Sequence, residues 1–117
     1  MFKCLLAISV ILLSLVACTS RETELYNQGV EFAESGHYQY AIASFDKAIE
    51  LKPDYHEVYY ERGNAYNING EYSKAIDDYN KTLEFYPQYA EAYKKRGHSL
   101  TICEVYLKSK QANDFLH

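Results

Sequence analysis

The sequence predicts an all-α fold of stacked antiparallel helix pairs, with two full repeats and a degenerate third. The first observation is a period of 34 residues, which relates Gly29 to Gly63 and Gly97. The second is that Pro53 and Pro87 are separated by the same step. The third is the spacing of apolar residues within each repeat, which is helical rather than alternating. A fixed period of this length indicates units that stack on one another.

Residues 1–17 have the composition of an export signal. Lys3 precedes an apolar run from Cys4 to Val16, which is 13 residues long, whereas a bilayer-spanning helix needs about 20. The run leads into Leu15-Val16-Ala17-Cys18, which resembles the lipobox of bacterial lipoproteins. The resemblance implies cleavage before Cys18 and acylation of its thiol. An ordinary signal peptide and an uncleaved anchor are the alternatives, but neither explains a cysteine directly after Ala17.

Cleavage would leave a short linker at residues 18–21 and a repeat domain at residues 22–117. We expect its units at 22–55, 56–89 and, in degenerate form, 90–117. Cys4 would leave with the signal and Cys18 would become a thioether, so no internal disulfide is expected. The remaining Cys103 is expected to be a small buried side chain on a helix.

Each of the first two units contains two apolar stripes at helical spacing, separated by a glycine turn. The stripes of the first unit are Leu25, Gln28, Gly29 and Phe32, then Tyr38, Ala41, Ile42, Phe45, Ala48 and Ile49. Those of the second are Tyr59, Arg62, Gly63 and Tyr66, then Tyr72, Ala75, Ile76, Tyr79, Thr82 and Leu83. The turns fall at Ser35-Gly36-His37 and Asn69-Gly70-Glu71, where glycine can adopt the left-handed conformation that ends a helix.

The third unit contains no such turn. Its corresponding residues are Ile102-Cys103-Glu104-Val105, which predict one continuous helix from about Ala90 into Leu107 or beyond. We expect residues 108–117 to be frayed or weakly packed, and the exposed apolar end of the stack to favour self-association or docking of a partner helix. The alternative is a degenerate second helix that folds back as a cap.

The repeated positions resemble the tetratricopeptide-repeat family, whose 34-residue pattern places large apolar, small and proline residues at fixed offsets. The resemblance covers about 90 residues and is strong for two units. The second unit departs from the pattern at Arg62 and Thr82, and the third fades after Leu100. The resemblance implies that the first helices of successive units line a concave groove for a segment of another protein.

By this resemblance, twelve residues would face the groove. The proposed contact residues are Tyr26, Asn27, Val30, Tyr60, Asn64, Asn67, Lys94, Lys95 and His98, with Glu57, Glu61 and Glu91 beside them. Tyrosine rings and asparagine amides suit a peptide backbone, although the same residues could form an ordinary solvated face. Replacing Tyr60 and Asn64 by alanine is predicted to weaken partner capture without unfolding the domain.

Family members that clamp the acidic carboxy termini of chaperones use lysine and amide residues in the first two units and cations in the third. In this sequence those places are taken as Tyr26, Val30, Glu61, Glu91 and Lys95. Carboxylates would repel an acidic tail, so chaperone-tail binding is not expected.

Other function classes find little support. The net charge is −4, and removing Lys3 with the signal makes it −5, so neither nucleic acid nor anionic lipid is an expected partner. No nucleophile with its base, phosphate-binding loop or metal-binding motif is present, and the four histidines lie 19 or more residues apart. We therefore expect no enzyme activity, no cofactor and no metal.

The sequence thus predicts a lipid-tethered scaffold or adaptor in a bacterial cell envelope, facing the periplasm or the exterior and serving envelope assembly or secretion. In a Gram-negative cell, Thr19 after the lipidated cysteine would favour the outer membrane. The alternatives are an enzyme acting on cell-wall or peptide substrates and a self-assembling structural lipoprotein.

Overall fold

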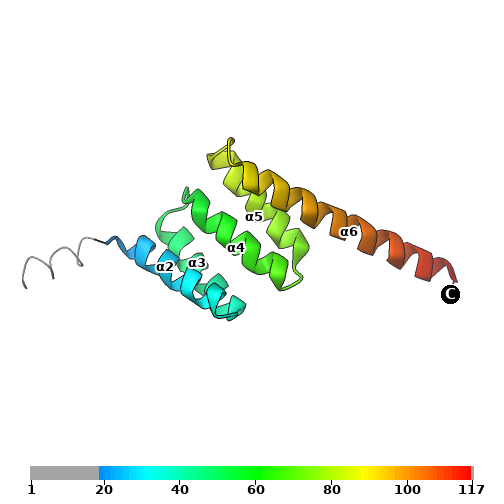
Figure 1. Cartoon of the computed structure of the whole chain (residues 1–117), viewed down its shortest axis with the longest axis horizontal. Helices are drawn as coiled ribbons and strands as arrows, with labels where there is room; N and C mark the ends of the chain where they lie inside the picture. The colour runs from blue at the N-terminus through cyan, green and yellow to red at the C-terminus, as the bar shows by residue number, and fades with distance from the viewer. Residues whose placement is uncertain (1–18, 117) are drawn as a thin grey trace, which may run out of the picture.

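The computed structural model describes residues 19–116, so the export signal and Cys18 lie outside the described residues. Five helices follow one another there: α2 (Arg21–Glu34), α3 (Tyr38–Leu51), α4 (His56–Ile68), α5 (Tyr72–Phe85) and α6 (Ala90–Leu116). Between residues 19 and 116 there is no strand. The predicted all-α fold of two helix pairs and a degenerate third unit is confirmed (Figure 1).

The two predicted turns are built around glycines in the left-handed region. Gly36 has φ +78° and Gly70 has φ +82°. After Gly36, the His37 N–H donates to the Phe32 carbonyl at 2.8 Å, and after Gly70 the Glu71 N–H donates to the Tyr66 carbonyl at 2.9 Å. These bonds satisfy carbonyls that the helix ends would otherwise leave unpaired.

Within each full unit, the two helices approach closely at a helical glycine. A Cβ atom at Gly63 would lie 2.8 Å from Cε1 of Tyr79, and a Cβ at Gly29 would collide with the ring of Phe45. Both rings are completely buried. Glycine is therefore required at these positions because an aromatic ring occupies the space of its missing side chain.

The core consists of two clusters, one for each unit. The first is formed by Leu25, Ala41, Phe45, Ala48 and Val58. The second is formed by Tyr60, Ala75, Tyr79, Leu83 and Ala92. Val58 belongs to α4 and Ala92 to α6, so each unit is closed by a residue from the next. A single helix pair does not bury its own apolar face, which is why the units depend on their neighbours.

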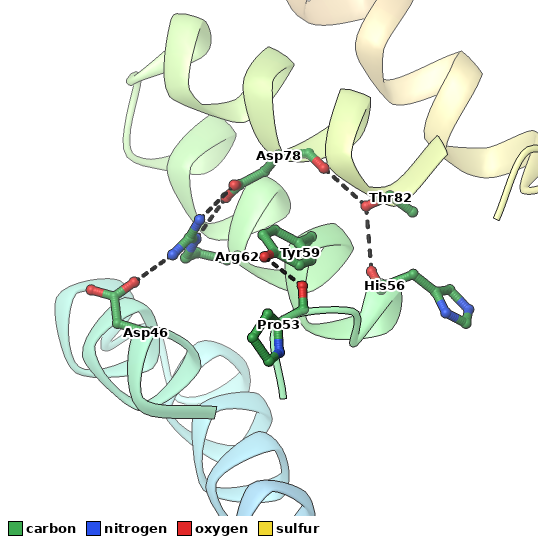
Figure 2. A network of polar contacts seen from close by, with 7 residues as sticks. All are labelled: Asp46, Pro53, His56, Tyr59, Arg62, Asp78 and Thr82. Carbon is green, nitrogen blue, oxygen red and sulfur yellow. Dashed lines mark hydrogen bonds and ion pairs between the residues drawn. The ribbon is translucent and has the colours of Figure 1, made fainter. Parts of the chain in front are cut away.

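The two departures from the family pattern belong to a polar network between the units (Figure 2). The Arg62 guanidinium donates to Asp46 in the first unit at 2.7 Å, and to both carboxylate oxygens of Asp78 at 2.8 and 2.7 Å. The buried Thr82 hydroxyl donates to the Asp78 carbonyl at 3.0 Å and lies 3.3 Å from the His56 carbonyl. Both polar side chains are therefore satisfied where the pattern has apolar ones.

The third unit is one uninterrupted helix, α6, which runs back along α5 and extends far past the point where α5 begins (Figure 1). The prediction of a single helix without a turn is confirmed. Residues 108–116 are helical but exposed, so this segment is weakly packed, as one half of the expectation had it, and is not frayed. Cys103 is half-buried rather than buried, and it lines a surface hollow with the end of the α4–α5 turn and the first residues of α5. No helix among the described residues is both long and apolar enough to cross a membrane.

Candidate peptide-binding groove

The first helices of the three units, α2, α4 and α6, form one layer, and α3 and α5 pack behind them (Figure 1). Where the three first helices converge, the surface has a hollow of about 350 Å³, called here the groove. It is lined by Val30, Ala33, Glu34, Tyr38, Glu61, Asn64, Ala65, Ile68 and Lys95. Residues from all three units therefore contribute to one depression.

Three of the predicted contact residues, Val30, Asn64 and Lys95, line the groove, together with the predicted neighbour Glu61. The others lie on the same helices outside the hollow: Tyr26, Asn27, Tyr60, Asn67, Lys94 and His98, with Glu57 and Glu91. Asn27, Lys94 and His98 are exposed.

With this geometry established, similarity to known proteins identifies the fold family. A family model described as a tetratricopeptide repeat matches residues 26–90, more than half of the chain. The chain belongs to the tetratricopeptide-repeat (TPR) family. Comparison with curated protein sequences gives no match.

Solved TPR structures superpose well on the chain. MamA is 32% identical over 67% of this chain with a TM-score of 0.66, and this chain spans only 46% of MamA. The second TPR domain of Spaghetti (RPAP3), solved with the HSP90 peptide SRMEEVD, is 21% identical with a TM-score of 0.71, covering 81% of this chain and 88% of its own. The TPR2B domain of yeast Sti1, solved with pHsp70, is 22% identical with a TM-score of 0.69, covering 80% and 74%.

Tyr60 is part of the core of this TPR chain rather than an open contact residue. It is 9% exposed, and its ring centroid lies 4.8 Å from that of Tyr89 and 6.0 Å from that of Tyr79. Asn64 is also engaged, because its Oδ1 accepts a hydrogen bond from the Tyr79 hydroxyl at 2.9 Å. That alanine at both positions weakens partner capture without unfolding the domain stays a prediction, but the variant is expected to be less stable, because truncating a packed aromatic costs about 3 to 5 kcal/mol.

Asn67 joins two of the first helices. Its Oδ1 accepts a hydrogen bond at 2.8 Å from the hydroxyl of Ser99, a completely buried residue of α6. This bond fixes α6 beside α4, so Asn67 holds one wall of the groove in place. Its amide oxygen is already used within the domain.

The end of the layer near Tyr26 combines aromatic rings with carboxylates. Tyr26 packs against Tyr55 with centroids 5.5 Å apart. Burial, and after it the negative charge of Glu61, raises the pKa of Tyr26 to about 12. Burial also raises the pKa of Tyr60, and Glu61 and Glu91 raise it further. These tyrosines remain neutral at ordinary pH, and the charges close to them are negative.

Glu61, at the place predicted for the second-unit amide of the chaperone clamp, lines the groove. Asn64 lies one helical turn later on α4 and also lines the groove. An acidic ligand would therefore meet a carboxylate and an amide side by side.

Sequence reasoning missed the apolar surface that the groove offers. Ile68, the last residue of α4, is 61% exposed and lines the hollow with Ala33 and Ala65. Its spacing from Glu61 and Asn64 is helical, so the same helix face predicts its place. Ile68 directly precedes the predicted turn at Asn69, so it was not counted among the groove residues.

The remaining chemistry of the described residues is limited. Between residues 19 and 116, no group of three or more His, Cys, Asp or Glu side chains is arranged to hold a metal ion. In the same range, no buried side-chain nitrogen or oxygen lacks a hydrogen-bond partner.

Proposed function

We propose that this TPR chain is a lipid-anchored scaffold of a bacterial cell envelope, which binds segments of other proteins in its groove. The observation that carries the proposal is the hollow formed jointly by α2, α4 and α6, which has apolar, amide and charged side chains on its walls. TPR domains solved with peptides of chaperones have the same fold, which supports a role in protein interaction. Service to envelope assembly or secretion is part of this proposal.

The groove suits a ligand with an apolar anchor and balanced charge. Ile68, Ala33, Ala65 and Val30 provide apolar surface, and Lys95 and Glu61 supply one charge of each sign. Binding sites are usually lined by apolar side chains with a few polar groups placed among them. The anchor would rest on Ile68, the most exposed apolar side chain of the hollow.

An acidic chaperone tail is not the proposed ligand. Tyr26 and Val30 stand where the clamp needs a cation and an amide, and Glu61 lies in the groove. Asn64, one helical turn after Glu61, already accepts a hydrogen bond from the Tyr79 hydroxyl. Unpaired carboxylates facing an acidic ligand disfavour binding.

Attachment to the membrane rests on the cysteine after Ala17. Each buried methylene contributes about 0.8 kcal/mol, so two or three acyl chains hold a protein on a bilayer stably. The described helices offer no apolar span that could replace such an anchor.

The attachment is tested by metabolic labelling of the full chain with a radioactive fatty acid in a bacterial host. We expect the wild type and Cys103→Ala to incorporate label and fractionate with membranes, because Cys103 lies on α6 and is not part of the lipobox. Cys18→Ala is expected to lose the label and to remain uncleaved or become soluble. Label retained by Cys18→Ala would contradict the anchor and would leave the groove proposal standing.

A further inference from the structure

One side of α6 is uncovered although its equivalents in the first two units are closely packed. Gly29 and Gly63 lie against aromatic rings, but a Cβ at Gly97 would meet nothing within 4 Å. Beside it, Tyr93 is 48% exposed and Leu100 is 43% exposed. These residues occupy the face against which a second helix packs in the other units. No described residue of the chain covers this face, since α6 continues straight (Figure 1).

The polar contacts of α6 are incomplete at the same place. Arg62 binds one carboxylate from the preceding unit and the carboxylate of Asp78 in its own second helix. Arg96, 34 residues later, repeats the first contact, because its Nη1 donates to Asn80 at 2.8 Å. The counterpart of Asp78 falls on Ala112, and among residues 19–116 no carboxylate pairs with Arg96. The uncovered face therefore lacks a packed second helix, and Arg96 beside it lacks a carboxylate partner.

We propose that a second copy of this chain covers this face, with the two α6 helices antiparallel and crossing at Leu100. The second helix of each full unit runs antiparallel to the first, so the carboxy-terminal half of one α6 would replace the missing second helix of the other copy. With 27 residues, and at about 1.5 Å per residue, α6 is about twice as long as its neighbours and can serve both roles. A two-fold axis satisfies both copies at once.

The sequence of α6 is complementary to itself about Leu100. In an antiparallel pair, residues equally far before and after Leu100 face each other. Tyr93 then meets Leu107 of the second copy, and Tyr93, Leu100 and Leu107 recur at the seven-residue spacing of paired helices. Leu107 is 58% exposed, so it is available for this contact.

The charges select this register. Arg96 faces Glu104 of the second copy. Glu104 would then pair with Arg96 as Asp78 pairs with Arg62. Glu104 is exposed and makes no hydrogen bond or ion pair within residues 19–116. A shift by one heptad keeps apolar residues opposed but separates Arg96 from Glu104. The pairing is independent of the lipid anchor and of the groove, which lies on another face of α6.

The test is sedimentation equilibrium of the full chain in detergent matched to the solvent density. We expect the wild type to form a dimer and Glu104→Arg to weaken it by about tenfold or more, since Arg96 of each copy then faces an arginine and is repelled. Arg96→Glu is expected to do the same, and the double variant Arg96→Glu with Glu104→Arg to restore the dimer. Lys94→Glu, on the groove side of α6, is the control and is expected to leave the dimer unchanged.

Two outcomes would overturn the proposal. One is a wild-type chain that stays monomeric at all concentrations up to the solubility limit, which would leave a different protein as the cover. The other is a double variant that is no more dimeric than either single variant. Helical circular dichroism of each variant shows whether it has folded, and Glu104→Arg decides the matter if Arg96→Glu does not fold, because Glu104 has no polar partner within residues 19–116 of its own copy.

Discussion

Arg62 shows how one residue can break a family pattern and still stabilise the fold. Its side chain is 19% exposed and that of its partner Asp78 is 5% exposed, so their contact is almost dry. Burial raises the pKa of Asp78, while the bonds from Arg62 counteract this effect and favour the ionised carboxylate. Removing one member of a buried ion pair costs about 3 to 5 kcal/mol, because the other charge is left uncompensated. Arg62 and Asp78 therefore depend on each other.

The first unit provides the replacement that tests this dependence. At the equivalent places it has Gln28 and Ser44, joined by a neutral hydrogen bond of 3.3 Å. We predict that Arg62→Gln lowers the free energy of unfolding by about 3 kcal/mol, and that Arg62→Gln with Asp78→Ser recovers most of the loss. Urea denaturation followed by circular dichroism measures both values. A double variant as unstable as Arg62→Gln alone would contradict the mutual dependence.

At the scale of helices, glycine has different structural roles at different positions of the chain. Gly36 and Gly70 turn the backbone with positive φ, whereas Gly29 and Gly63 make room for rings. Gly97 does neither in the isolated chain, because it is helical and a Cβ atom there would meet nothing within 4 Å. A glycine inside a helix costs about 0.5 to 1 kcal/mol relative to alanine. The fold offsets this cost only where a neighbouring side chain packs into the space left by the missing glycine side chain.

Alanine substitutions separate these cases. In the Glu104→Arg background, where paired copies would be absent, we predict that Gly97→Ala raises the free energy of unfolding by about 0.5 to 1 kcal/mol. Gly63→Ala is predicted to lower it by about 1 to 3 kcal/mol, because the new methyl group would lie 2.8 Å from the Tyr79 ring. Urea denaturation compares the two. If Gly97→Ala lowered the free energy of unfolding as Gly63→Ala does, the Gly97 face would be covered.

For the whole molecule, the fold was predictable because its determinants are local. Glycine turns, proline ends and helical stripes act within a few residues, and even the missing turn at Ile102-Cys103-Glu104-Val105 was visible in the sequence. The division of tyrosines between core and groove was not predictable. Tyr60 is covered by Tyr79 from α5 and by Tyr89, which precedes α6, so its burial depends on two later segments.

The limits of α6 illustrate the same point. Its continuation past Leu107 needs only the absence of a helix-ending residue, which the sequence shows. Its last turns have no packing partner, so intrinsic helix propensity decides whether they stay helical. Lys108, Lys110, Gln111 and Ala112 are good helix formers. The helix therefore extends further than its weak apolar stripe suggests.

The most direct measurement of the central claim is photo-crosslinking of the full chain in a bacterial host from a single position in the groove. A photoreactive amino acid at Ile68 would lie in the hollow, and the same amino acid at Leu51, which is 55% exposed on α3, would lie outside it. We predict a discrete crosslinked protein in the membrane fraction from Ile68, none from Leu51, and loss of the Ile68 product when Lys95→Glu is added. Equal products from both positions, or none from Ile68, would contradict a segment-binding groove.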